Sequence, residues 1–335
     1  MTWFENLTSI PETNGEQISR QLEVDGEWLI SHANGQRWRA GRLETPTLAE
    51  LRNRTNELEN VPHGRLMVDE VVADAESLLK DSDNAGSLFQ VASQFNLLEM
   101  AGPEVTPEQG VGIYEYDHTQ GPACAVAAGA GTIYRNYFVP VGNQIGQTAD
   151  CQIDCLTDIG QALGNDQDRL WEMCNGYVVA DESGLVEISE RLGNSSAAER
   201  NRLRGCLRIG LQWDTQVTLP GCEHLVSQAY CSALPVAYNH QPVSLWEPFA
   251  RLILEAAYEA TMCAGVINFH KTGNKIVYLT LIGGGVFGNK TSWITDSLER
   301  ALRIHRHAGL DVRIVSYGRS NPAVQDLIDR LGYMA

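Results

Sequence analysis

A glycine-rich segment near the end of the sequence offers the clearest chemistry. It follows the apolar run 276–282, and its residues are Gly283, Gly284, Gly285, Val286, Phe287, Gly288 and Asn289. Glycines allow successive backbone N–H groups to turn toward one point, and a helix that starts directly afterwards adds about half a positive charge. The segment therefore predicts a site for a phosphate or pyrophosphate that needs no Lys or Arg side chain.

The residues on either side of this loop predict a βαβ unit. Apolar residues recur at helical spacing from Ile294 to Leu302, and residues 311–317 form an apolar run that is typical of a returning strand. The unit implies that the strands at 276–282 and 311–317 are parallel neighbours.

Two other interpretations of the loop stay open. Its spacing Gly283-x-Gly285-x-x-Gly288 also matches the dinucleotide fingerprint of Rossmann enzymes. Only 47 residues follow Gly288 in a chain of 335, which leaves room for one strand and a terminal helix, and no acidic residue closes the next strand. The other alternative is a plain glycine turn without a ligand, although four glycines cost backbone entropy that a plain turn need not spend.

Two polar segments could add contacts to an anionic ligand. The first is the run 89–99, whose amides Gln94 and Asn96 donate and accept hydrogen bonds and therefore suit sugar hydroxyls. The second is a charged and aromatic loop that leads into a helix of small residues, predicted over 121–130. The candidate residues of this loop and helix start are Asp117, Thr119, Gln120 and Gly121.

Carboxylates are the candidate catalytic groups. Asp117 precedes the small-residue helix, where it either takes part in chemistry or caps a helix or turn. Asp214 interrupts the strand-like run 207–217, and the alternation of that run would turn its side chain toward solvent.

Composition and charge exclude several classes of protein. The chain has 43% hydrophobic and 20% charged residues, which is ordinary for a globular protein. Its formal net charge is −17 and its Lys and Arg residues do not cluster, so we expect no nucleic-acid or anionic-membrane partner. The sequence shows neither a basic, apolar leader nor an apolar stretch of about 18 residues, and we expect a soluble, cytoplasmic protein.

Neither a metal nor a cofactor is expected. The eight cysteines contain no C-x-x-C pair, so reduced and mostly buried thiols are the simplest interpretation. Cys151 and Cys155 have helical spacing, but no His completes a zinc set. Asp150, Asp154 and Asp158 are spaced to line one face of a helix, either as a solvated stripe or as a site for a divalent cation.

The pattern along the chain divides it into two regions. Residues 1–85 predict an accessory region, with short strands over 22–39 joined by the hairpin dipeptides Asp-Gly and Asn-Gly, and a helix that starts at Thr47. Residues 86–335 alternate strands and helices, which indicates an α/β layer architecture, and the polar stretch 142–205 interrupts them as an insertion. The expected elements of this second region are strands at 88–93, 207–217 and 225–238 and a helix at 249–264.

These segments together resemble the macrodomain family, whose members bind ADP-ribose, and the resemblance covers residues 87 to 335. The helix at 255–261, the strand at 276–282 and the loop at 283–288 look like the family's helix, strand and phosphate loop of the form G-x-G-V-F-G. Residues 93–96 lie where the family has N-A-A-N and keep the final Asn. Residues 120–123 replace the family's second glycine loop. The resemblance implies a three-layer α/β fold in which helices flank a mixed sheet, here with a small β-rich region in front of it.

The resemblance also implies where the ligand lies. The glycines of the loop would approach the diphosphate, while Val286 and Phe287 would shape the pocket of the distal ribose. Asn96 would hold a ribose hydroxyl, and the adenine would stack near Tyr317, at the end of the last strand.

Taken at full length, as residues 89–96, 114–123 and 283–289, these motifs are similar to those of a divergent macro-type group of ADP-ribosyl-arginine hydrolases. Hydrolysis of that N-glycosidic bond passes through an oxocarbenium-like state and needs carboxylates beside the ribose, for which Asp117 is the first candidate and Asp214 the second. The expected partner is then ADP-ribose or an ADP-ribosylated protein, and the oligomeric state stays open. A reader module without activity and a nicotinamide-dependent oxidoreductase are the alternatives.

Overall fold

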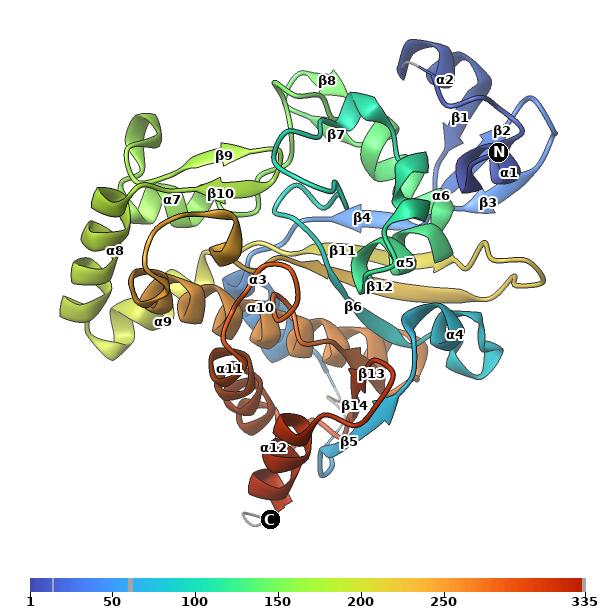
Figure 1. Cartoon of the computed structure of the whole chain (residues 1–335). Helices are drawn as coiled ribbons and strands as arrows, with labels where there is room; N and C mark the ends of the chain where they lie inside the picture. Colours follow the sequence, from blue (N-terminus) through green and yellow to red (C-terminus); the bar gives the residue numbers. More distant parts are fainter. Residues whose placement is uncertain (14, 60–62, 333–335) are drawn as a thin grey trace.

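The architecture is a mixed seven-stranded sheet between layers of helices, with a small three-stranded sheet beside it (Figure 1). The computed structural model describes residues 1–13, 15–59 and 63–332. The strand order is β4 (Arg42–Glu44), β11 (Gly210–Gln216), β12 (Leu225–Cys231), β6 (Leu88–Ala92), β13 (Ile276–Leu279), β14 (Asp311–Ser316) and β5 (Met67–Val72). Neighbours from β12 to β5 are parallel, whereas β11 runs antiparallel to β12 and to β4. The expected α/β class is confirmed.

Helices cover both faces of the large sheet because its strands present apolar side chains on both sides. On β12, Gln228 bonds to a carbonyl of α5 (Gln120–Ala127), while the Cys231 thiol lies against α10 (Val243–Thr272) on the opposite face. The layer with α10 also contains α3 (Leu48–Glu57), α8 (Glu182–Asn194), α9 (Ala197–Gly205), α11 (Thr291–Ile304) and α12 (Pro322–Gly332). The other layer contains α4 (Ala75–Lys80), α5 and α6 (Gly129–Ile133).

The central helix α10 is longer than the sequence pattern predicts. It starts six residues before the expected 249 and continues to Thr272, where Gly273 ends it in the left-handed conformation at φ 77°. By length and composition this helix would also suit a membrane span, but 83% of its most apolar window is buried inside the protein. Burial on all sides explains why an apolar helix forms here, as in the core of a large domain.

The predicted N-terminal meander is confirmed. Strands β1 (Leu22–Asp25), β2 (Trp28–Ser31) and β3 (Arg37–Arg39) pair antiparallel, and Gly26 and Gly35 take the positive φ values that their tight turns require. Helix α3 begins after Thr47 with the expected capping box to Glu50. The strands β4 and β5 come from the same N-terminal region and form both edges of the large sheet, so the expected boundary near residue 85 does not divide that sheet.

Several predicted elements differ in length or shape. The helix expected over 121–130 is broken at Ala128 into α5 and α6, and the strand expected over 276–282 ends at Leu279. Strand β7 (Pro140–Val141) directly precedes the insertion and pairs with β8 (Gln144–Ile145) inside it; the insertion also contains α7 (Thr157–Leu163), β9 (Glu172–Cys174), β10 (Tyr177–Val179), α8 and α9.

The three aspartates of the insertion do not share a helical face, which corrects that expectation. Helix α7 starts only at Thr157, the Asp154 carboxylate accepts the N–H of Leu156, and Asp158 pairs with Arg208 at 2.8 Å. In the part of the chain that the structure describes, no group of three or more His, Cys, Asp or Glu side chains is placed to hold a metal ion. All eight cysteines are unpaired, and four of them are buried.

A buried ion-pair cluster ties the N-terminal region to the helical layer, and it supplies a test of the fold. Glu259 on α10 is 3% exposed and contacts Arg52 of α3 and Arg300 of α11, each at 2.6 Å. The variant Glu259→Gln leaves two guanidinium groups without their carboxylate, so we expect the free energy of unfolding to fall by about 3 kcal/mol. The more exposed Glu247→Gln, which loses a pair with Arg251 on the same helix, should cost less than about 1 kcal/mol. Equal losses in denaturant titrations would contradict this account.

Candidate functional site

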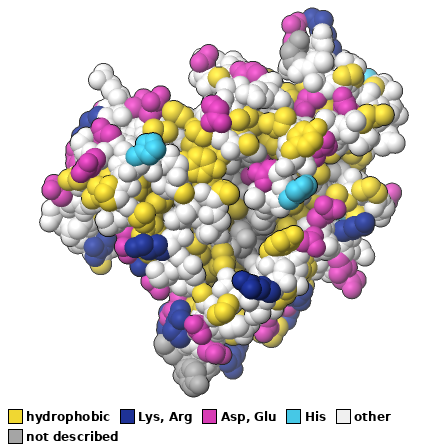
Figure 2. Space-filling view, in the orientation of Figure 1, with side chains coloured by type: hydrophobic (Ala, Val, Ile, Leu, Met, Phe, Trp, Pro, Cys, Tyr) yellow, Lys and Arg dark blue, Asp and Glu magenta, His cyan; other side chains and the backbone are white. Residues whose placement is uncertain are grey.

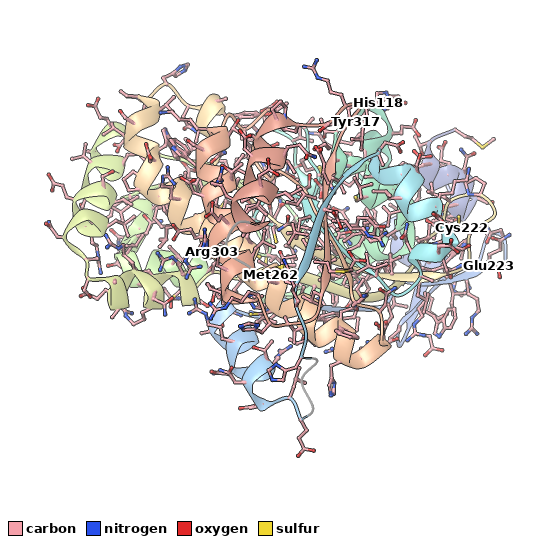
Figure 3. The ribbon with its side chains drawn as sticks, turned by 90° about the horizontal axis from the view of Figure 1, so that it is seen from below. His118, Cys222, Glu223, Met262, Arg303 and Tyr317 are labelled. Carbon is pink, nitrogen blue, oxygen red and sulfur yellow. The ribbon has the colours of Figure 1, made fainter. Side chains whose placement is uncertain are left out.

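A cavity of about 330 Å³ lies at the carboxyl ends of β6 and β13. Hydrophobic side chains gather around the middle of this face (Figure 2), and Figure 3 shows His118 and Tyr317 on the same side of the molecule, where loops project beyond the strands. Most of the predicted site residues line the cavity: Gln94, Asp117, Thr119, Gln120, Gly121, Gly283, Gly285, Val286 and Phe287. Within the described residues, no Lys or Arg lines it.

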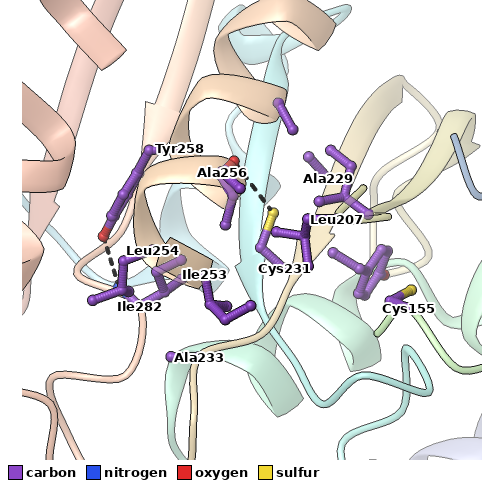
Figure 4. Packing of buried hydrophobic residues seen from close by; sticks show 14 of the residues in the cluster. Cys155, Leu207, Ala229, Cys231, Ala233, Ile253, Leu254, Ala256, Tyr258 and Ile282 are labelled. Atoms are coloured by element: carbon purple, nitrogen blue, oxygen red, sulfur yellow. Dashed lines mark hydrogen bonds between the residues drawn. The ribbon is translucent and has the colours of Figure 1, made fainter. Parts of the chain in front are cut away.

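The glycine loop forms one wall of the cavity, and α10 holds the start of this loop. The Tyr258 hydroxyl donates to the carbonyl of Thr280 at 2.8 Å and accepts the N–H of Ile282 at 3.0 Å (Figure 4). Gly283 and Gly288 then take φ values of 74° and 71°, which only glycine adopts without strain. The chain therefore turns sharply at both ends of the loop.

The backbone of this loop offers free donors to the cavity. In the described part of the chain, no hydrogen bond uses the N–H groups of Gly283, Gly285, Val286 or Phe287, and all four residues line the cavity. Successive N–H groups without acceptors form a concave site for an anion. The helix α11 starts only at Thr291 and does not line the cavity, so the loop alone forms this part of the site.

Three loop residues that we predicted as ligand contacts support the loop instead. The Asn289 amide is buried and donates to the carbonyl of Leu234 at 2.8 Å. Gly288 packs against Ala237, where a Cβ atom would come within 2.8 Å of the alanine side chain, and Gly284 lies close to Ile294. None of these three residues lines the cavity, so their positions do not support direct contact with a ligand.

The amide side chains after β6 and at the start of α5 also form hydrogen bonds within the protein. Asn96 is fully buried, its oxygen accepts the N–H of Leu98, and its nitrogen donates to Gln152, so its position does not support a contact with a ribose. Gln94 lines the cavity and accepts the N–H of Met100 at 2.9 Å. Gln120 lines it as well, but its amide bridges the backbone of Gln90 and Ala92. These amides shape the wall of the cavity.

A buried carboxyl group, Glu99, stands in the cavity wall and was not predicted from the sequence. Its side chain is 3% exposed, and one oxygen, Oε1, has no hydrogen-bond partner within the described residues. The carboxyl lies against the start of α5, where a Cβ atom on Gly121 would come within 2.4 Å of Glu99 Oε2 and 2.0 Å of the carbonyl oxygen of Ala92. Gly121 is therefore needed for close packing, and no larger residue fits there.

The electrostatic environment of Glu99 is unusual. Burial raises the pKa of its carboxyl well above the ordinary value of 4.5; the positive charge of Arg135 opposes this shift, and the charge of Asp117 adds to it. The Arg135 guanidinium is itself buried, stacks on Tyr230 at 3.7 Å and donates to the carbonyl of Leu97, but it forms no ion pair with Glu99. The protonated form of Glu99 is thus favoured, and a buried acid is available beside the cavity.

Asp117 is the second carboxyl of the cavity. It follows the short helix η3 (Gly112–Tyr116), and its Oδ1 accepts the N–H of Thr119 at 2.9 Å. Asp117 therefore closes a turn before α5, which is one of the two roles expected from the sequence, and it also lines the cavity. The two roles are compatible because a carboxylate has a second oxygen to offer.

Asp214 does not belong to this site, which corrects the second catalytic candidate. It lies at a bulge in β11 with φ 53° and forms an ion pair with Lys271 at the end of α10. Because β11 runs antiparallel to β12, Asp214 is at the end of the sheet opposite to the glycine loop. The direction of the chain, which the pattern of a single strand does not reveal, places it away from the cavity.

Tyr317 lines a neighbouring cavity of about 370 Å³ that shares Thr280 and Leu281 with the first. Its side chain is 83% exposed, so a flat ring there is available to a ligand. The two cavities follow one another across the carboxyl ends of β13 and β14. An elongated ligand can therefore extend from the carboxyl groups past the glycine loop to Tyr317.

An aromatic wall completes the cavity, and sequence patterns missed most of it. Tyr177, Tyr238 and Phe287 lie with their ring centroids 5.3 to 5.6 Å apart. Tyr177 comes from the hairpin β9–β10 of the insertion, and Tyr238 from the short helix η6 (Val236–Tyr238). A Tyr in a polar insertion carries no local signal of this position.

The pH dependence of stability tests the burial of Glu99. Its folded pKa lies above its unfolded value, so its contribution to stability is full below the unfolded pKa of 4.5 and is lost as pH rises toward the folded pKa. We therefore expect Glu99→Gln to gain stability relative to the parent protein over the range in which the pH rises above 4.5. Melting temperatures across this range provide the measurement, with the exposed Glu190→Gln on α8 as the control. A difference between Glu99→Gln and the parent that does not change with pH would disprove the assignment.

No model of a protein family matches the chain, and no curated protein matches it. A poly(ADP-ribose) glycohydrolase from Thermomonospora curvata is similar in structure, with 11% identity, a TM-score of 0.46, and 94% of this chain and 95% of that chain covered. The structure of the same enzyme bound to the inhibitor ADP-HPD has 10% identity and a TM-score of 0.45, with 94% of this chain and 95% of that chain covered. The poly(ADP-ribose) glycohydrolase from Deinococcus radiodurans in complex with ADP-ribose has 10% identity and a TM-score of 0.44, with 87% of this chain and 94% of that chain covered.

Proposed function

We propose that the protein binds ADP-ribose in this cavity and hydrolyses it from modified side chains of proteins. One observation carries the proposal: a loop with unused N–H donors and two carboxyl groups, Glu99 and Asp117, line the same cavity. The donors suit a diphosphate, and the carboxyl groups suit a ribose whose anomeric carbon becomes positively charged. Neither feature alone would indicate both binding and chemistry.

ADP-ribose fits the succession of surfaces across the two cavities. Its diphosphate would lie on the N–H groups of Gly285, Val286 and Phe287, and its distal ribose between this loop and the carboxyl groups. The adenosine end would then extend into the neighbouring cavity, where the exposed ring of Tyr317 offers a stacking surface. A nicotinamide oxidoreductase is less well supported, because a dinucleotide fold places the pyrophosphate at the start of the helix after the loop, and that helix, α11, does not line the cavity.

The reaction needs no group that the cavity lacks. The bond between the anomeric carbon and the leaving nitrogen breaks, and its electron pair stays with the nitrogen while the ribose ring becomes oxocarbenium-like. The Asp117 carboxylate would stabilise this positive ring. Water then attacks the anomeric carbon, and its proton passes to the Asp117 carboxylate, because Glu99, whose raised pKa favours the protonated form, already holds a proton.

Arginine is the modified side chain that this cavity suits best. A guanidine is basic enough to leave already protonated, so the reaction requires anionic groups near the ribose more than a strong acid. Within the described residues, the cavity contains two carboxyl groups and no Lys or Arg that would repel a guanidinium. We also propose a cytoplasmic location, which the eight unpaired cysteines support.

A charge placed in the loop tests the phosphate site. At Gly285 a Cβ atom would meet nothing within 4 Å, so Gly285→Glu can point into the cavity without disturbing the loop. Its negative charge and volume would then oppose the diphosphate, and we expect the affinity for ADP-ribose to fall by about 100-fold in calorimetry. The control Gly193→Glu adds the same charge on α8, also with nothing within 4 Å, and should bind like the parent. Unchanged affinity in a folded Gly285→Glu protein would refute the site, and preference of the parent for NAD would revive the dinucleotide interpretation.

Removal of one carboxylate tests the chemistry. Asp117→Asn preserves the size of the side chain and can still accept the N–H of Thr119, so we expect ADP-ribose affinity within about tenfold of the parent. Its turnover on ADP-ribosyl-arginine protein should fall by about 100-fold or more, the usual scale for one acid or base group. The assay measures release of ADP-ribose from arginine-, serine- and glutamate-modified protein without added metal, and Asp150→Asn on the surface is the control. Full activity of Asp117→Asn would remove it from the mechanism, and a parent that binds ADP-ribose but releases none would be a reader.

A further inference from the structure

The short helix η3 connects the two carboxyl groups of the cavity. Asp117 directly follows its last residue, and the N–H of Asp117 bonds to the carbonyl of Tyr114 at 3.1 Å. The hydroxyl of Tyr114, which is 1% exposed, accepts the backbone N–H of Glu99 at 3.1 Å. The relative position of Asp117 and Glu99 therefore depends on where η3 lies.

A carboxylate from the N-terminal segment holds the beginning of η3. The two oxygens of Glu12 accept the N–H groups of Val111 at 2.7 Å and Gly112 at 2.6 Å, and the Tyr137 hydroxyl donates to the first oxygen at 2.7 Å. These N–H groups are at the start of a helix, where they have no partner within it. Hydrogen bonds to an ionised acceptor are shorter and stronger than neutral ones, so Glu12 fixes this end of η3 firmly.

The chain around Glu12 is shaped for this contact. At Gly112 a Cβ atom would come within 2.4 Å of the Glu12 carboxylate, and at Gly110 within 2.6 Å, so the glycines leave room for it. A second residue of the same segment, Trp3, donates its indole N–H to the carbonyl of Val111 at 2.9 Å and its backbone N–H to Glu115 at 2.7 Å. Neither Glu12 nor Trp3 lines the cavity.

We propose that Glu12 is a positioning residue for hydrolysis: through η3 it sets the places of Asp117 and Glu99, and the N-terminal segment thereby supports the active site. This inference rests on the proposed function. It gives residues 1–12 a role in turnover, although they do not touch the ligand. A shift of about 1 Å in a catalytic group is enough to lower a rate strongly. Among the described residues, Glu12 forms hydrogen bonds with Val111, Gly112 and Tyr137, none of which belongs to the loop that would bind the diphosphate.

The test compares Glu12→Gln with Glu16→Gln. The amide that Glu12→Gln introduces keeps one acceptor oxygen but presents an NH₂ group to an N–H donor, so it cannot hold both N–H groups of η3. Glu16 is exposed on α2 (Gly15–Gln21), and among the described residues it pairs with Arg20 on the surface. Calorimetry with ADP-ribose gives the affinity and, from the stoichiometry, the folded fraction, and kcat on ADP-ribosyl-arginine protein is expressed per binding site. For Glu12→Gln we expect kcat to fall about tenfold or more with Kd within about threefold, and for Glu16→Gln no change.

Tyr137→Phe provides a second variant if Glu12→Gln does not fold. It removes one of the three hydrogen bonds to Glu12 and keeps the ring, so we expect a smaller fall in kcat, about two- to fivefold, again without loss of affinity. Glu12→Asp, which keeps both oxygens, should retain more activity than Glu12→Gln. The inference would be overturned if Glu12→Gln had the same kcat per binding site as the parent. If only Tyr137→Phe folds, the same result for that variant would overturn it. A parent that neither binds nor releases ADP-ribose would instead overturn the proposed function.

Discussion

The parallel pairing of β6, β13 and β14 is the constraint on which the rest of the site depends. Residues of β13 lie opposite Leu88 and Phe89 of β6 and opposite the start of β14, so the three strands end at the same edge of the sheet. The glycine loop after β13 and the polar segment after β6 are brought together there, although they are almost 190 residues apart in the sequence. Asp214 shows the converse, because one reversal of chain direction places it at the opposite edge.

The burial of Glu99 is the feature of this edge that stability alone does not explain. A carboxyl group without a full set of partners costs free energy in the interior, and an apolar residue of similar size would cost less. Arg135 lowers the cost through its charge but is held elsewhere by Leu97, Thr132 and Tyr230. Buried ionisable groups that lack a full set of hydrogen-bond partners and line a cavity are typical of functional sites.

The way in which the cavity would bind an anion is matched to the charge of the protein. The chain has a net charge of −17, so at long range it repels a diphosphate. Salt screens that repulsion beyond about 8 to 10 Å, whereas N–H donors act at hydrogen-bond distance. A site built from backbone groups therefore selects its ligand by shape and the directions of its donors, and it leaves the carboxyl groups free of competing cations.

Local patterns determined a large part of this protein. The glycine loop, the βαβ unit around it, the two N-terminal hairpins and the capping box at Thr47 could all be predicted, because each depends on residues within a few positions of one another. Asp117 was also within reach, as a carboxylate next to a helix of small residues. What only the tertiary structure decided is which side chains meet. Glu99 reaches the cavity because Gly121 leaves space for it. Tyr177 reaches it because the insertion folds back onto the aromatic wall. Asn96 does not reach it, because its side chain is held by hydrogen bonds to Leu98 and Gln152. Apart from the bond between Asn96 and Leu98, these contacts join residues that are distant in the sequence, and their energies depend on burial and strand direction, neither of which a single segment encodes.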